Sequence, residues 1–173
     1  MKRNIISFIL IIMLVFAAAG CADTATDVSP FVSSENGFIT VDEKTKEEMR
    51  HPVFTVDEDL EKDKEKLATY LFSQWLELGK QGKLITVSTE TQVRCAKLDD
   101  YKINQVKPYE KEDDPSSTFR FTVSFSVLPT GEYNDWIAGN GVDGEDGWIN
   151  NKSLLVEFYK TKNGYKLESL ATG

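Results

Sequence analysis

Side chains that commonly act as nucleophiles or bases are scarce in this chain of 173 residues. Its two cysteines are Cys21 and Cys95, and its single histidine, His51, lies beside Pro52. A catalytic cysteine needs a base within hydrogen-bond reach, and His51 stands at the edge of a segment expected to be flexible. The sequence also contains no Gly-x-Ser-x-Gly turn, no zinc-type cluster of His and Glu and no phosphate-binding loop. We therefore predict no catalytic residue and no cofactor, and we expect Cys95 to be a small buried strand residue.

Cys21 stands at the end of a distinctive N-terminal segment. Two basic residues precede an apolar run at residues 5–19, and Ala18-Ala19-Gly20 leads into the cysteine. A positive start, a short apolar core and small residues before a cleavage site are typical of an export signal, and the run is too short to span a bilayer. The ending resembles the lipobox of bacterial lipoproteins. In that family the cysteine receives a diacylglyceryl group and becomes the first residue of the mature chain.

The resemblance implies a division of the chain into three parts. Residues 1–20 are a lipoprotein signal peptide, and Cys21 is the lipidation site that makes the cell membrane a partner on its extracytoplasmic face, in a Gram-positive bacterium. Residues 21–54 are predicted to be a mostly flexible tether, because their first half is rich in small polar residues. An alternative for the second half is a short strand at residues 38–41 and a brief helix before Pro52. Residues 55–173 are expected to form a single domain.

The charge of the chain bears on its partners. The net charge is −8, and removing Lys2 and Arg3 with the signal peptide takes it to −10. Nucleic acid is excluded as an expected partner, since its binding depends on Lys and Arg neutralising phosphates. A cationic protein or peptide is favoured instead. The alternative is that the surplus carboxylates keep the surface soluble.

A helix is predicted from Asp57 to Gly79. Thr55-Val56-Asp57-Glu58 fits a capping box, and Gly79 or Gly82 can end the helix. Apolar residues recur at spacings of three and four, which gives the helix one apolar face. The members of this face are Leu60, Leu67, Ala68, Leu71, Phe72, Trp75, Leu76 and Leu78.

Strands follow the helix. Residues 85–95 alternate as one long or two short strands, residues 101–109 and 119–127 alternate again, and Asn163-Gly164 predicts a tight turn after the strand at 154–158. The expected fold is α+β, an N-terminal amphipathic helix packed on a curved antiparallel β-sheet. This order resembles the cystatin and nuclear-transport-factor-like architecture. Because relatives with that architecture often dimerise through the sheet, a homodimer is a further expected partner.

The segment from Gly131 to Asn150 is the most unusual part of the sequence, since long loops in compact domains are often functional. Tyr133, Trp136 and Trp148 are candidates for a ligand or partner surface, because aromatic rings offer large contact areas. The alternative is that the rings fold inward and attach the loop to the domain.

The same segment supplies hard oxygen ligands for calcium. The candidates are Asp135, Asn140, Asp143, Glu145 and Asp146. Their spacing does not match an EF-hand loop, and acid-rich glycine loops are commonly just solvated. Calcium is therefore an alternative, and no metal site is predicted.

Together these features predict a membrane-anchored extracytoplasmic lipoprotein whose domain is a non-catalytic binding or interaction module of the cell envelope. The alternative is a small-molecule-binding or enzymatic domain that uses a cavity between helix and sheet, with Phe72 and Trp75 lining it. The two differ in whether the concave face of the sheet is filled or hollow.

Overall fold

The computed structural model describes residues 37–109, 115–131, 136 and 140–172. The predicted signal peptide, Cys21 and the first part of the predicted tether lie outside these residues. Within the described ranges, no helix combines the length and the apolar character needed to cross a membrane.

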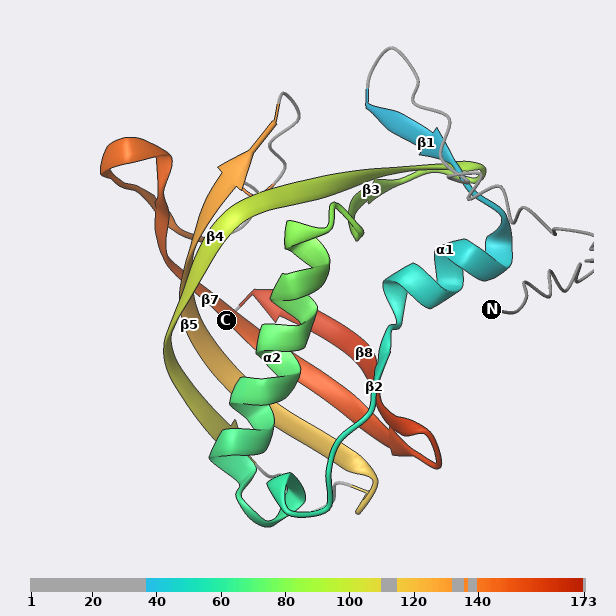
Figure 1. Cartoon of the computed structure of the whole chain (residues 1–173), viewed down its shortest axis with the longest axis vertical. Helices are drawn as coiled ribbons and strands as arrows, with labels where there is room; N and C mark the ends of the chain where they lie inside the picture. Colours follow the sequence, from blue (N-terminus) through green and yellow to red (C-terminus); the bar gives the residue numbers. More distant parts are fainter. Residues whose placement is uncertain (1–36, 110–114, 132–135, 137–139, 173) are drawn as a thin grey trace, which may run out of the picture.

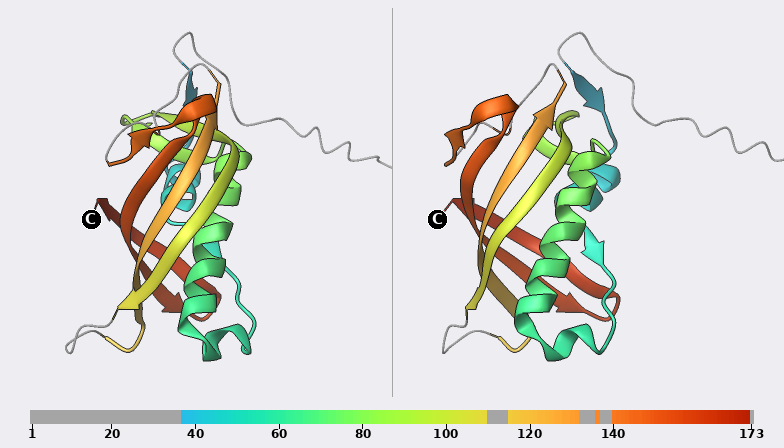
Figure 2. Two further views of the ribbon diagram at one scale, coloured as in Figure 1. Left: turned by 90° about the vertical axis from the view of Figure 1, so that its left-hand side faces the viewer. Right: turned by 60° about the vertical axis from the view of Figure 1, so that its left-hand side comes forward.

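An antiparallel sheet forms the body of the molecule and curls into a half-barrel around a helix (Figures 1 and 2). Its centre is a meander of four neighbouring strands, in which each pairs with the next. These strands are β4 (Gln92–Tyr109), β5 (Thr118–Thr130), β7 (Ile149–Thr161) and β8 (Gly164–Thr172). Four shorter strands join them: β1 (Phe38–Thr40) and β3 (Leu84–Ser88) pair with β4, β6 (Val142–Asp143) with β7, and β2 (Val53–Phe54) with β8. With two helices beside this sheet, the expected α+β class and curved antiparallel sheet are confirmed.

The long helix, α2 (Lys64–Lys80), begins later than predicted. Asp63 is its N-cap and accepts a hydrogen bond from the Lys66 N–H at 3.1 Å, so the predicted start at Asp57 is wrong. The preceding residues form a separate 3₁₀ turn, η1 (Leu60–Lys62), and the extended backbone of Asp63 prevents the turn from continuing into the helix. At the other end, Gly82 has a φ of 66°, which lets the Lys83 N–H bond to the Leu78 carbonyl at 2.8 Å and end the helix.

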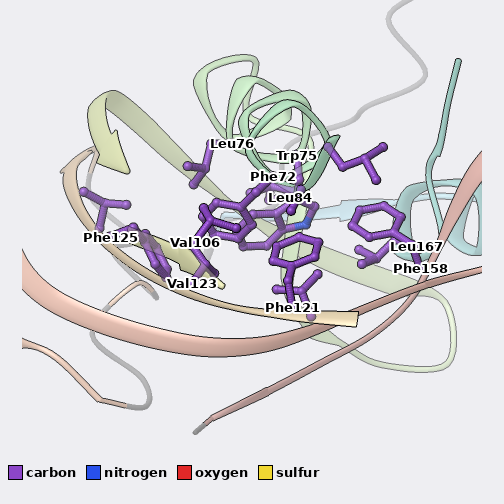
Figure 3. Close-up of a cluster of buried hydrophobic side chains, with 14 of the residues drawn as sticks. Phe72, Trp75, Leu76, Leu84, Val106, Phe121, Val123, Phe125, Phe158 and Leu167 are labelled. Atoms are coloured by element: carbon purple, nitrogen blue, oxygen red, sulfur yellow. The ribbon is translucent and has the colours of Figure 1, made fainter. Parts of the chain in front are cut away.

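Aromatic rings join α2 to the concave face of the sheet (Figure 3). The ring of Phe72 lies 4.9 Å from that of Phe125 and 6.3 Å from that of Phe121, between ring centroids. All three side chains are fully buried. The apolar face predicted for the helix is therefore the one that meets the sheet. Further members of this core are Leu67, Leu71, Leu76, Val106, Val123, Val127, Val156, Phe158 and Leu167.

The strand predictions are confirmed with two refinements. Residues 85–95 fall into two strands, and the second continues without a break through Pro108, which pairs with Phe121. The expected polar face of β5 has one buried member, Ser126, because the register with β7 shifts between Phe125 and Val127. The tight turn is present, since Thr161 pairs directly with Gly164.

Residues 38–54, part of the predicted mostly flexible tether, form β1, α1 (Glu43–Arg50) and β2. We refer to this segment as the strap. Its helix is capped by Asp42, whose carboxylate accepts from the Thr45 N–H at 2.6 Å. The strap pairs with β4 at one end and with β8 at the other, so it joins strands that lie far apart in the sheet order. These pairings explain why a polar segment is ordered.

Candidate binding surface

Between α2 and the central strands of the sheet, the space is occupied by side chains. Phe72 and Trp75 were the residues expected to line a cavity there. Their rings stack on each other at 5.3 Å between centroids, and Phe72 also contacts rings of the sheet, whereas Trp75 additionally lines the groove described below. Interior packing of this kind excludes water and ligand at the positions that these rings fill.

Two tryptophans of the Gly131–Asn150 segment lie in different surroundings. Trp136 is 6% exposed and packs edge-on against Trp75, with 5.7 Å between ring centroids. Trp148 is half-buried, and the Lys102 ammonium lies 4.1 Å from the centroid of its ring. Tyr133 lies outside the described residues. Trp136 therefore follows the inward alternative, whereas Trp148 keeps part of its ring accessible.

A buried lysine attaches this segment to the sheet. Lys152 is 4% exposed, and its ammonium donates hydrogen bonds to the carbonyl oxygens of Trp136 at 2.8 Å and Asn140 at 2.7 Å. Burial lowers the pKa of Lys152 below its ordinary value, because desolvation disfavours the charged form. The Asn140 amide also bonds to the backbone N–H and carbonyl of Ser153, both at 2.8 Å. These contacts attach Trp136 and Asn140 to β7.

The calcium candidates are not gathered into a site in the described structure. The amide of Asn140 is engaged by Ser153, and Asp143, Glu145 and Asp146 are exposed. Asp135 lies outside the described residues. Across the ranges that the structure describes, no group of three or more His, Cys, Asp or Glu side chains is placed to hold a metal ion.

The two remaining reactive side chains of the described residues, Cys95 and His51, are held by the fold and do not meet. Cys95 is half-buried on β4, and burial raises the pKa of its thiol to about 11, which keeps it protonated at neutral pH. His51 lies at the end of α1, where its Nδ1 donates to the Leu167 carbonyl at 2.9 Å. The two side chains are thus engaged in different parts of the fold, Cys95 opposite Ile85 and His51 against β8.

Polar contacts hold α1 against the rest of the molecule. Lys46 is the helix's buried residue, and its ammonium donates to the carbonyl oxygens of Glu90 at 2.6 Å and Thr89 at 3.5 Å. Arg50 donates from Nη2 to the Ser88 hydroxyl at 2.6 Å. The helix is therefore attached to the β3–β4 turn mainly by a lysine and an arginine.

A groove of about 270 Å³ lies beside this helix. Figure 1 shows the elements around the groove. In this view β8 passes behind α2, and α1 and β3 lie above β8. The groove was not predicted, because it is assembled from α1, α2, β3 and β8, and β8 lies at the far end of the chain from α1. The one available signal was Leu170, an apolar residue in a final strand with few charges. The lining residues are Met49, Arg50, Trp75, Leu84, Ile85, Thr86, Ser88, Leu167 and Leu170.

No protein-family model, curated protein or solved structure was found to match this chain.

Proposed function

We propose that this protein is a membrane-anchored extracytoplasmic lipoprotein whose α+β domain is a non-catalytic binding module of the cell envelope. The packed interior between α2 and the central strands of the sheet is the observation that carries the proposal of a module. The rings of Phe72, Phe121 and Phe125 occupy the space in which a ligand or substrate of a hollow domain would sit. A domain built this way offers its outer surface to a partner, and a protein or peptide uses such a surface better than a small molecule does.

The architecture supports the same proposal. One long helix followed by the meander β4–β5–β7–β8 is the element order expected for the cystatin and nuclear-transport-factor-like architecture. We propose that the domain has this architecture. Since the same fold carries many unrelated functions, the function rests on the surface and not on the fold.

Membrane anchoring is proposed from the lipobox resemblance at Ala18-Ala19-Gly20-Cys21. A diacylglyceryl group supplies two acyl chains, and two chains hold a protein on a bilayer where one is marginal. The strap is the last part of the predicted tether and begins with β1, so a lipid on Cys21 would reach the domain through β1.

The test is membrane fractionation of cells that express the full chain. Cys21→Ser removes the thiol that would be acylated, and we expect the protein to move from the membrane fraction to the soluble or secreted fraction. Cys95→Ser is the matched control, because it removes the other thiol and should leave the protein on the membrane. Retention of the Cys21→Ser protein in the membrane would overturn the lipid anchor.

A further inference from the structure

The outer edge of β8 is only partly paired. β2 pairs with Tyr165 and Lys166, and the next residue, Leu167, donates its N–H to the Pro52 carbonyl at 2.9 Å and accepts from His51. Over residues 168–172, β7 is the only strand partner in the part of the chain that the structure describes. All five of these residues are exposed. An unpaired strand edge presents free N–H and C=O groups, which form a template for another strand.

The groove beside α1 lies next to this open edge. Leu167 and Leu170 of β8 line it, and Leu170 remains 37% exposed although it is apolar. Trp75 and Leu84 bring further apolar surface from α2 and β3. A strand edge with an adjacent groove of mixed apolar and polar lining supplies the two parts of strand-addition recognition, in which backbone bonds give affinity and a side-chain site gives specificity.

The charge on the groove indicates which chemical group a bound segment would carry. Arg50 is the one charged side chain among the nine described residues that line the groove, and its guanidinium contacts the hydroxyl of Ser88. A guanidinium at the side of this groove complements a carboxylate, with which it forms short, charge-assisted hydrogen bonds. The volume of about 270 Å³ suits one or two side chains and lies below the usual range for a complete drug-sized ligand.

We infer that the open edge of β8 and the neighbouring groove bind an extended segment of a partner protein, one that carries an apolar side chain for the groove and a carboxylate for Arg50. This inference rests on the proposed function, in that the partner is a polypeptide. The segment adds to the edge at residues 168–172, the apolar side chain contacts Leu167 and Leu170, and the carboxylate pairs with Arg50. Glu168 is the one acidic residue of this edge.

The test uses the full chain, purified in detergent and immobilised, with a library of random peptides of strand length as the probe. We expect the selected peptides to combine an apolar residue with an acidic one. Binding of these peptides should weaken at least about tenfold for Leu170→Glu, which places a charge on the edge. Selection on Arg50→Glu should instead yield peptides with a basic residue at the position of the acidic one. The control is Val142→Glu, a matched change at an exposed apolar residue on β6, and it should leave binding unchanged.

Three results would overturn the inference. The first is that the selected peptides bind all three variants as they bind the wild type, which would place the site elsewhere. The second is a library selection that enriches no sequence. The third is self-association of the full chain that Leu170→Glu abolishes, which would make a second copy the occupant of the edge. Each result leaves the Cys21→Ser fractionation untouched, so failure of this site can be told apart from failure of the lipid anchor.

Discussion

The outer edges of β4 and β8, on opposite sides of the half-barrel, differ in how far other elements cover them. Over residues 97–109, β4 has β5 as its strand partner in the described chain, and α2 lies alongside it (Figure 2). The Tyr101 hydroxyl donates to Glu77 on α2 at 2.8 Å. Over residues 168–172, the described part of the chain gives β8 neither a helix with such a contact nor a strand partner besides β7.

Charge and regularity separate the two edges further. The β4 stretch carries five charged residues and a proline, and its register with β5 shifts twice. Charged side chains, proline, bulges and a covering helix are the features by which sheet edges resist unwanted pairing. Residues 168–172 contain one charge, that of Glu168, and an exposed leucine. The comparison teaches that β4 is closed to further strands and that β8 is available to one.

The largest expected effect comes from loosening the helix that covers β4. Phe72→Ala removes a fully buried ring that contacts Phe121 and Phe125, and we expect the free energy of unfolding to fall by about 3–5 kcal/mol. Chemical denaturation measures this. Phe38→Ala is the control, because that ring is only half-buried and lies on β1, and it should cost much less. A loss below about 1 kcal/mol for Phe72→Ala would contradict the packing of α2 that protects β4.

The next effect concerns the helix beside the β8 groove. Lys46→Ala removes the buried ammonium that donates to the carbonyls of Thr89 and Glu90, so we expect a loss of about 1.5–3 kcal/mol. Amide hydrogen exchange should rise first in α1, which loses its attachment. Lys44→Ala on the same helix changes a side chain that is 87% exposed, and it should leave both measurements as they are. Equal effects of the two substitutions would show that Lys46 does not hold the helix.

A smaller effect is expected where β4 meets α2. Tyr101→Phe removes the hydrogen bond to Glu77 and should cost about 1 kcal/mol at neutral pH, measured by urea denaturation. Burial, assisted by Glu77, raises the pKa of Tyr101 from 10.0 to about 12. The folded protein therefore keeps the phenol proton between pH 10 and 12 while the unfolded chain releases it, and stability falls as the pH rises through this window.

This pH dependence has its own control. The fall in unfolding free energy between pH 10 and 12 should be shallower in Tyr101→Phe than in the wild type. Tyr109→Phe, at an exposed ring near the end of β4, should keep the wild-type slope. Identical slopes for all three proteins would mean that Tyr101 does not link β4 to α2 in solution.

The smallest effect is expected at the open edge. Leu170→Glu alters a residue that is 37% exposed, so the free energy of unfolding should change by no more than about 0.5 kcal/mol. Denaturation curves measure this change. Val106→Glu, at the buried face of β4, is the contrasting variant and should lower the free energy of unfolding far more. A Leu170→Glu protein as unstable as Val106→Glu would show that the β8 edge is covered.

Local patterns in the sequence predicted much of the fold. The spacing from Leu67 to Leu76 identified the helix face, and Asn163-Gly164 identified the last turn, because both depend on neighbouring residues alone. The start of the helix was misplaced because two acidic segments, one at Asp57 and one at Asp63, offer similar caps. The structure selects Asp63, whose extended backbone separates the 3₁₀ turn from the helix.

The candidate site was less accessible to prediction. Trp136 and Trp148 look alike in the sequence, and only the position of Trp75 determines that the first ring is covered. The groove depends on residues from α1, α2, β3 and β8, which a one-dimensional pattern does not bring together. Arg50 is one of six charged residues in the polar helix α1, and its place beside the groove follows from the docking of the strap.

That docking has a consequence for the order of folding. His51 and the carbonyl that it contacts are 116 residues apart in the chain, and the strap closes this long loop when it meets β8. Loop closure over such a separation costs entropy before any contact compensates for it, so we expect α2 and the meander to form first and the strap to dock last. The groove comes into existence with that final step. A partner that recognises it therefore distinguishes the finished domain from a chain that is still folding.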